Sequence, residues 1–239
     1  FRPVLMRILS GVKSEYTIID ADTICLLEYF DEEPGLIMEV GSHDEPIANM
    51  LAECGFKVIG VDLRGYHSAE PGEQSPKCNY KYIRSDFCNL PTEVIQEYIG
   101  KIDYIVSVSA IEHFGLDTYG EGFYSPYYDV IAMRTMWQLL KDQGTAYITV
   151  PYGASFVEYG KHWRIYDGES IAARLVQDFH MEYAVVFVAD DVEINGRKLQ
   201  RWDYISVDDA AQYIGHEPHL TVLIKLRKVL LNRLAPDGR

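Results

Sequence analysis

Hydrophobic positions along the chain fall into two patterns, which alternate as far as residue 151. Short apolar runs are typical of buried parallel strands, and apolar residues three or four apart are typical of amphipathic helices. The runs predict strands over 35–41, 57–62, 80–86, 102–108 and 144–150. The helical spacing predicts helices over 20–30, 45–54, 92–99 and 129–140. Strands and helices in alternation predict one α/β domain around a largely parallel sheet.

The alternation ends after Pro151. A helix is predicted over 168–178, followed by strands over 183–188 and 220–226 with no long helix between them. Two late strands joined in this way suggest an antiparallel addition at one edge of the sheet. Residues 65–79 are rich in Gly, Pro and Ser, and are predicted to form a surface loop.

Charge and cysteine content limit the expected partners. The formal net charge is -14, and such an acidic surface repels phosphate backbones, so a nucleic-acid partner is not expected. The four cysteines form no Cys-x-x-Cys pair, and no apolar run is long enough to span a membrane. His216 and His219 lie three apart, but Pro218 breaks the helix that would align them, so no metal site is predicted. A cytoplasmic location is the expectation.

Candidate chemistry lies where the predicted strands end. Glu39 and Gly41 close the first strand, and Asp62 closes the second. In a doubly wound sheet ligands bind outside the carboxyl ends of the strands, where Gly allows close approach and an acidic side chain accepts bonds from ribose hydroxyls. These residues fit NAD as well as S-adenosylmethionine, and they also fit a plain turn and helix cap.

Two further motifs follow the next strands. Asp86 and Phe87 come after the third strand, where a carboxylate can accept a bond from an adenine amine while the aromatic ring lies against the base. The fourth strand runs into a polar loop that contains Ser109, Glu112 and His113.

The ordered series Glu-Val-Gly, Val-Asp-Leu, Ser-Asp-Phe and Ile-Asp-Tyr-Ile-Val-Ser…Ile-Glu-His resembles the motifs of class I S-adenosylmethionine-dependent methyltransferases. The segment Leu-Leu-Lys-Asp-Gln-Gly-Thr at 139–145 continues the likeness, which covers about residues 35–151. The resemblance implies a doubly wound Rossmann-like fold, with a mostly parallel seven-stranded sheet whose last strand is antiparallel. It also implies S-adenosylmethionine as cofactor, a helical segment at 1–34 and a methyltransferase domain at 35–239. By position, the residues implied to bind the cofactor are Glu39, Gly41, Asp62, Leu63, Asp86, Phe87 and Ser109.

The loop after the first strand departs from the family's Glu-x-Gly-x-Gly-x-Gly pattern. His43 and Glu45 occupy the second and third Gly positions. Their side chains could crowd the ligand, which keeps open a methyltransferase-like binding or scaffold domain without turnover. Asp44 and Glu45 would repel a pyrophosphate, so an NAD-dependent oxidoreductase is the weaker alternative.

The acceptor side is predicted in two loops, 111–128 and 152–168. His113 and His162 are the candidate bases that would take a proton from an acceptor hydroxyl, although a structural role for either is equally consistent with the sequence. The predicted acceptor-binding residues are Glu112, Tyr152, Trp163, Arg164 and Tyr166. The aromatic segment 114–128 contains three glycines and is either a lid or a loop packed on the sheet. The predicted activity is methyl transfer to a hydroxyl of a small molecule, sugar or glycan intermediate.

Overall fold

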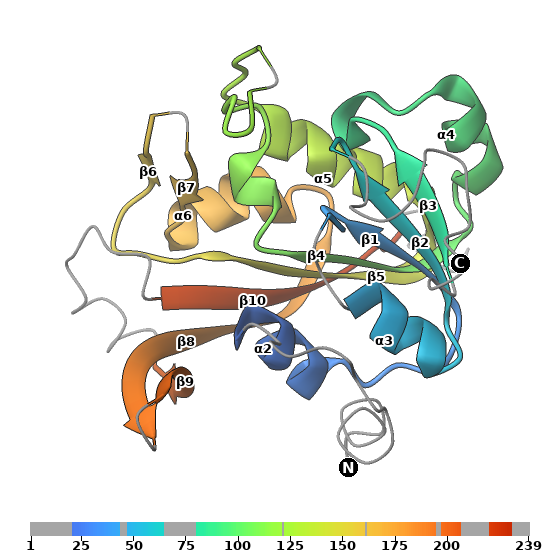
Figure 1. The fold of residues 1–239 in the computed structure, drawn as a ribbon. Coiled ribbons are helices and arrows are strands. Elements are labelled where there is room, and N and C mark those ends of the chain that lie inside the picture. The colour runs from blue at the N-terminus through green and yellow to red at the C-terminus, as the bar shows by residue number, and fades with distance from the viewer. Residues whose placement is uncertain are drawn as a thin grey trace, which may run out of the picture.

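The computed structural model describes residues 21–43, 47–64, 80–120, 122–160, 162–194, 197–206 and 220–230 (Figure 1). The predicted loop at 65–79 and the paired histidines at 216 and 219 lie outside these ranges. The strands of the main sheet are β1 (Leu36–Val40), β2 (Lys57–Asp62), β3 (Lys81–Arg84), β4 (Ile102–Val108), β5 (Leu140–Pro151), β8 (His180–Ile194), β9 (Arg197–Ile205) and β10 (Leu220–Arg227). The helices include α2 (Ala21–Tyr29), α3 (Ile47–Glu53), α4 (Thr92–Tyr98), α5 (Tyr128–Leu139) and α6 (Gly168–Ser170).

The strands form one eight-stranded sheet in the order β3-β2-β1-β4-β5-β10-β8-β9. The first five are parallel, with Val40 opposite Val61 and Met38 opposite Ile105. The last strand, β10, runs antiparallel to both β5 and β8, as the methyltransferase resemblance implies. β10 is therefore inserted within the sheet rather than at its edge, and the antiparallel edge strand is β9, which the sequence pattern did not predict.

Helices cover both faces of the sheet (Figure 1). On one face α2 and α3 bury Leu26, Leu27 and Met50 against the sheet. On the other face α4 and α5 lie over Met38 and Ile148, with Met133 and Met136 of α5 fully buried. Alternate residues of each strand thus face opposite cores, and burial on both faces explains why the strands are nearly continuous apolar runs.

The segment predicted as a helix over 168–178 forms two short pieces. Asp167 caps α6 by accepting from the Ser170 backbone N–H at 2.7 Å, and α6 continues into the π-helical turn η3 (Ile171–Val176). The turn ends at Gln177, whose φ of 42° lies in the left-handed region. A second, two-stranded sheet pairs β6 (Val157–Glu158) with β7 (Arg164–Ile165) in the loop after β5. In the part of the chain that the structure describes, no helix is both long and apolar enough to cross a membrane.

Candidate functional site

A pocket of about 240 Å³ opens at the carboxyl ends of β1, β2, β3 and β4. Loop 113–128, which connects the short 3₁₀ helix η2 (Ile111–His113) to α5, forms its opposite wall. Its lining from the sheet side comprises Gly41, Val61, Asp62, Leu63, Arg64, Ser85, Asp86, Phe87, Val108, Ser109 and Ala110. The lining from loop 113–128 comprises His113, Phe114, Gly115, Tyr119, Phe123 and Tyr128. The pocket therefore lies at the position where doubly wound sheets bind ligands.

The backbone conformation at the end of β1 requires glycine at position 41, and a ligand that approaches the backbone there would also require it. Its φ of +84° lies in the left-handed region, and its N–H donates to the Val61 carbonyl at 2.9 Å. A Cβ at this position would lie 2.3 Å from the Cβ of Ala110. Only glycine allows the loops after β1 and β4 to meet this closely at the floor of the pocket.

Asp62 presents a carboxylate on the pocket wall at the end of β2. Only 7% of the residue is exposed, and its Oδ1 accepts from the Arg64 backbone N–H at 2.7 Å. Its Oδ2 has no partner among the described residues. The Arg64 guanidinium carbon lies 4.0 Å from the centre of the Tyr119 ring, so an arginine beside β2 contacts the opposite wall.

Asp86 is held at both carboxylate oxygens. Oδ1 accepts from the Cys88 backbone N–H at 2.9 Å and caps the 3₁₀ helix η1 (Phe87–Asn89), and Oδ2 accepts from the Tyr128 hydroxyl at 3.1 Å. Burial and the neighbouring Asp86 carboxylate raise the pKa of Tyr128 to about 12, so the phenol keeps its proton and remains a donor. Phe87 packs beneath the pocket and is nearly fully buried.

Ser109 turns the chain at the end of β4. Its φ of 42° is unusual for a residue with a side chain, and several bonds hold it. The Ser109 N–H donates to the Thr149 hydroxyl at 3.0 Å, and the Ser109 hydroxyl donates to a carboxylate oxygen of Asp22 on α2. Helix α2 therefore contacts the pocket floor directly, in a backbone conformation of the kind that collects at functional sites.

His113 lies on the pocket wall with its ring oriented by a backbone carbonyl. Its Nδ1 lies 2.5 Å from the carbonyl oxygen of His162, which also accepts from the Thr118 hydroxyl at 2.8 Å. Because a carbonyl can only accept, Nδ1 carries the hydrogen, and Nε2 carries the lone pair of the neutral ring. His162 thus contacts His113 through its main chain. The ring of His162 is exposed, and its centroid lies 5.7 Å from that of the Trp163 ring.

Glu112 is a buried carboxyl beside the imidazole of His113. Its Oε1 lies 3.9 Å from His113 Nε2, and Oε2 has no partner among the described residues. Burial raises the pKa of Glu112 well above its usual value, and the negative charge of Asp22 adds to the rise. The positive charge of Arg164 opposes the rise without cancelling it.

Arg164 is fully buried and joins loop 113–128 to the β6–β7 hairpin. Its Nε donates to Glu158 Oε2 at 3.1 Å, and Nη1 donates to the Phe114 carbonyl at 2.8 Å. Longer bonds of 3.4 and 3.3 Å reach the carbonyls of Glu112 and Ser125. One guanidinium thereby ties both ends of the loop to one place.

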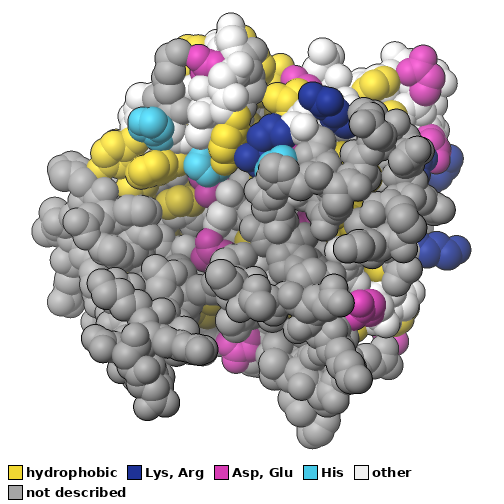
Figure 2. Space-filling model, viewed as in Figure 1, with side chains coloured by type: hydrophobic (Ala, Val, Ile, Leu, Met, Phe, Trp, Pro, Cys, Tyr) yellow, Lys and Arg dark blue, Asp and Glu magenta, His cyan; other side chains and the backbone are white. Residues whose placement is uncertain are grey.

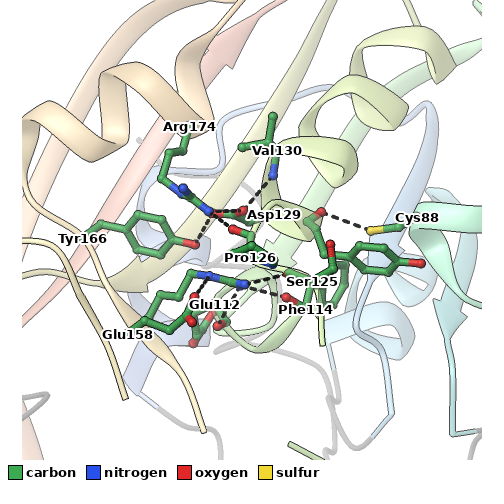
Figure 3. Close-up of polar contacts among 12 residues, drawn as sticks. Cys88, Glu112, Phe114, Ser125, Pro126, Asp129, Val130, Glu158, Tyr166 and Arg174 are labelled. Carbon is green, nitrogen blue, oxygen red and sulfur yellow. Dashed lines mark hydrogen bonds and ion pairs between the residues drawn. The ribbon is translucent and has the colours of Figure 1, made fainter. Parts of the chain in front are cut away.

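A second buried arrangement lies beside it around Asp129, at the start of α5 (Figure 3). Its carboxylate accepts from the Arg174 guanidinium at two bonds of 2.7 Å and from the Tyr166 hydroxyl at 3.0 Å. Arg174 also donates to the Pro126 carbonyl. The charges are paired and hydrogen-bonded, so this group fixes the start of α5 relative to η3.

Exposed aromatic side chains lie on the loops that follow β4 and β5. Figure 2 shows hydrophobic side chains gathered with histidine and basic side chains on the upper part of the molecule. The large hydrophobic residues exposed on loops 113–128 and 152–168 are Tyr119, Phe123, Tyr124, Tyr127 and Phe156. We call these five residues the aromatic rim. All five offer flat apolar faces, and Tyr119 and Phe123 among them line the pocket.

The structure gathers most of the predicted cofactor residues on one pocket. Those that line it are Gly41, Asp62, Leu63, Asp86, Phe87, Ser109 and the candidate base His113. Glu39 is buried behind the lining, as is Glu112. The other predicted acceptor residues, Tyr152, Trp163, Arg164 and Tyr166, and the ring of His162 lie outside the lining, and Arg164 and Tyr166 are fully buried in supporting contacts.

Sequence reasoning did not single out Arg64, Tyr128 or Asp22. Arg64 directly follows the Asp-Leu pair of the second motif, which is a signal that could have indicated it. Tyr128 and Asp22 approach the site from distant segments, and nothing local marks them. Among the described residues, no group of three His, Cys, Asp or Glu side chains could hold a metal ion.

Several solved structures with the same fold are methyltransferases. A TehB-like S-adenosylmethionine-dependent methyltransferase from Corynebacterium glutamicum has a TM-score of 0.51 at 14% identity, with 94% of each chain covered. A methyltransferase from Archaeoglobus fulgidus has a TM-score of 0.53 at 15% identity, covering 86% of this chain and 90% of that one. The 1,6-didemethyltoxoflavin-N1-methyltransferase from Burkholderia thailandensis, solved with S-adenosylhomocysteine bound, has a TM-score of 0.52 at 14% identity, covering 83% and 72%. The predicted class I methyltransferase fold is confirmed.

Sequence comparison adds a family. No curated protein sequence matches the chain. The profile of the family described as "Caenorhabditis protein of unknown function, DUF268" matches residues 82–207, which include β4, loop 113–128, α5 and the β6–β7 hairpin. Because that match spans more than half of the chain, this protein belongs to the DUF268 family, built on a class I methyltransferase fold.

Proposed function

We propose that this protein transfers a methyl group from S-adenosylmethionine to a hydroxyl of a small molecule, sugar or glycan intermediate. One observation carries the proposal: Gly41, Asp62 and Asp86, three motif residues from separate strands, line a single pocket together with an oriented imidazole at His113. A fold alone does not specify function, but this combination supplies both a nucleoside site and a proton acceptor.

The side chains present fit the nucleoside part of the cofactor. Asp62 Oδ2 is available for a ribose hydroxyl, because only Oδ1 is used by Arg64. Leu63 is 41% exposed at the pocket and offers an apolar face to the base, and the buried Phe87 also lines the pocket. Asp86 is placed to accept from the exocyclic amine of adenine, since each carboxylate oxygen retains a lone pair.

His113 is the proposed base. When bound, the cofactor supplies a methyl group on a positively charged sulfur, which is open to attack by an oxygen nucleophile. His113 Nε2 takes the acceptor's hydroxyl proton as the oxygen–carbon bond forms and the carbon–sulfur bond breaks. The His162 carbonyl at Nδ1 holds the ring in the tautomer that this step requires. The Glu112 carboxyl lies 3.9 Å from Nε2, beside the nitrogen that takes the proton.

The proposed acceptor region lies between loops 111–128 and 152–168. The aromatic rim supports a ring-shaped acceptor, because flat apolar faces suit sugars and other ring compounds. Arg164 and Tyr166 contribute by holding loop 113–128 and α5 in place, since both are buried. The pocket of about 240 Å³ is below the ~300–1,000 Å³ usual for small-molecule sites. We therefore place the acceptor toward the rim rather than within the pocket.

Calorimetric titration with S-adenosylmethionine and S-adenosylhomocysteine tests the cofactor assignment. Micromolar binding is expected, and Asp62→Ala should abolish it, whereas Asp178→Ala, which changes an exposed carboxylate far along the chain, should leave it unchanged. Absence of heat with either ligand in a folded sample would overturn the proposal. Binding of NADH in their place would favour the oxidoreductase alternative.

A screen of hydroxyl-bearing acceptors then tests turnover, with S-adenosylhomocysteine release as the readout. His113→Gln keeps a donor for the His162 carbonyl but cannot take up a proton, so it should retain cofactor binding and lose turnover. Cofactor binding without any methylated product, over a broad acceptor panel, would indicate a binding or scaffold domain instead. Equal turnover by His113→Gln would exclude His113 as the base.

A further inference from the structure

Tyr128 joins the pocket wall formed by loop 113–128 to Asp86 on the sheet side. It is the first residue of α5, its ring lines the pocket, and its hydroxyl donates to Asp86 Oδ2 at 3.1 Å. The other carboxylate oxygen is already fixed by the Cys88 N–H at 2.9 Å. Two donors from separate segments therefore set the plane of one carboxylate.

The position of the Tyr128 ring is itself tightly determined. The Phe123 ring packs against the Tyr128 ring with 4.9 Å between centroids. The Tyr128 carbonyl accepts from the Cys88 thiol at 3.2 Å. A Cβ on Gly115 would lie 2.7 Å from the Tyr128 Cβ. Loop 113–128 can therefore pass this close to Tyr128 only because residue 115 is glycine. Tyr128 is thus held by contacts from loop 113–128 on one side and from η1 on the other.

We propose that Tyr128 is a specificity-determining residue, which orients the Asp86 carboxylate so that the pocket selects a 6-amino purine. This inference rests on the proposed function, because it assigns a role within the same nucleoside site. A carboxylate fixed at both oxygens can direct its remaining lone pair at one donor. A ligand with an acceptor at that position brings two oxygens face to face with no hydrogen between them, which weakens its binding. Without the tyrosine hydroxyl, the carboxylate can rotate away and the selection weakens.

The test compares two probes, S-adenosylhomocysteine and S-inosylhomocysteine, in which a carbonyl replaces the 6-amino group. For the native protein we expect the amino compound to bind roughly 10- to 100-fold more tightly, the effect of one or two charged hydrogen bonds. Tyr128→Phe keeps the ring and loses only the hydroxyl, and it should reduce that ratio to within a few-fold of one. Asp86→Asn should reduce it similarly, and the double variant should add little, because both act through one carboxylate.

Tyr183→Phe is the matched control, since this tyrosine lies on β8 and does not line the pocket. It should leave the ratio unchanged. If Tyr128→Phe keeps the native preference for S-adenosylhomocysteine over S-inosylhomocysteine, the inference is overturned. It is also overturned if Tyr128→Phe weakens the binding of both probes equally, because that result indicates a merely structural role. Absence of binding by the native protein to either probe would instead contradict the proposed function. Near-ultraviolet circular dichroism verifies that each variant is folded.

Discussion

The buried guanidinium of Arg164 gives the most direct test of how loop 113–128 is held. Arg164→Met keeps much of the side-chain volume and removes every donor. Charged hydrogen bonds contribute roughly 1.5–3 kcal/mol each, but of the four here only those to Phe114 and Glu158 are 3.1 Å or shorter. The Glu158 side chain is 21% exposed and can partly rehydrate. We therefore expect a loss of about 3–5 kcal/mol in the free energy of unfolding, as for other broken buried pairs.

Urea denaturation followed by circular dichroism measures this loss. With a slope of about 2–3 kcal/mol per molar, the midpoint should fall by about 1–2.5 M. Arg134→Met is the matched control, because Arg134 is exposed on α5, and its effect should stay within about 0.5 kcal/mol. Arg164→Lys should restore only part of the loss, since one ammonium cannot span the positions that the planar guanidinium reaches. A midpoint for Arg164→Met equal to that of the control would refute the reasoning.

Further predictions concern the loop glycines and the buried carboxyl. Gly115→Ala should destabilise the fold by about 2–5 kcal/mol, since φ is +74° and a Cβ would lie 2.6 Å from the Ser125 carbonyl oxygen. Gly120→Ala, with φ of +80° but nothing within 4 Å, should cost only about 1 kcal/mol, and equal thermal shifts for the pair would contradict the predicted clash. Because the pKa of Glu112 is raised in the fold above its ordinary 4.5, the unfolded chain ionises first, and this group removes stability as the pH rises above about 4.5. Glu112→Gln should therefore gain stability relative to the native protein between pH 4.5 and 7 in urea titrations, and a difference that shrinks with pH would reverse the assignment.

The alternation of apolar runs and helical spacing was sufficient to predict the parallel half of the sheet. Strands β1, β2 and β4 lie within a residue of their predicted ranges, because each is buried on both faces and so reads as one apolar run. The edge strand β9 was not predicted. An edge strand is paired on one side only, and its apolar pattern is correspondingly weak.

The ordered motifs likewise predicted residues that line a single pocket. Gly41, Asp62 and Asp86 end neighbouring parallel strands, so their convergence follows from chain order and the rules of the doubly wound sheet. The sequence could also rank His113 as a candidate base, since it follows the fourth strand. It could not fix which ring nitrogen is basic, because the carbonyl that decides this belongs to His162, 49 residues away.

Only the tertiary structure decided what the other polar residues do. Arg164 and Tyr166 have the side chains of a binding loop, yet packing buries both, and their donors are used by Phe114 and Asp129. Tyr128, which looks like an ordinary first residue of a helix, reaches Asp86 across the pocket. Local sequence determines which segments become strands and helices, through periodicity and turn chemistry. The use of a particular donor or acceptor depends on contacts between segments far apart in the chain, and these exist only after the sheet and its loops have assembled.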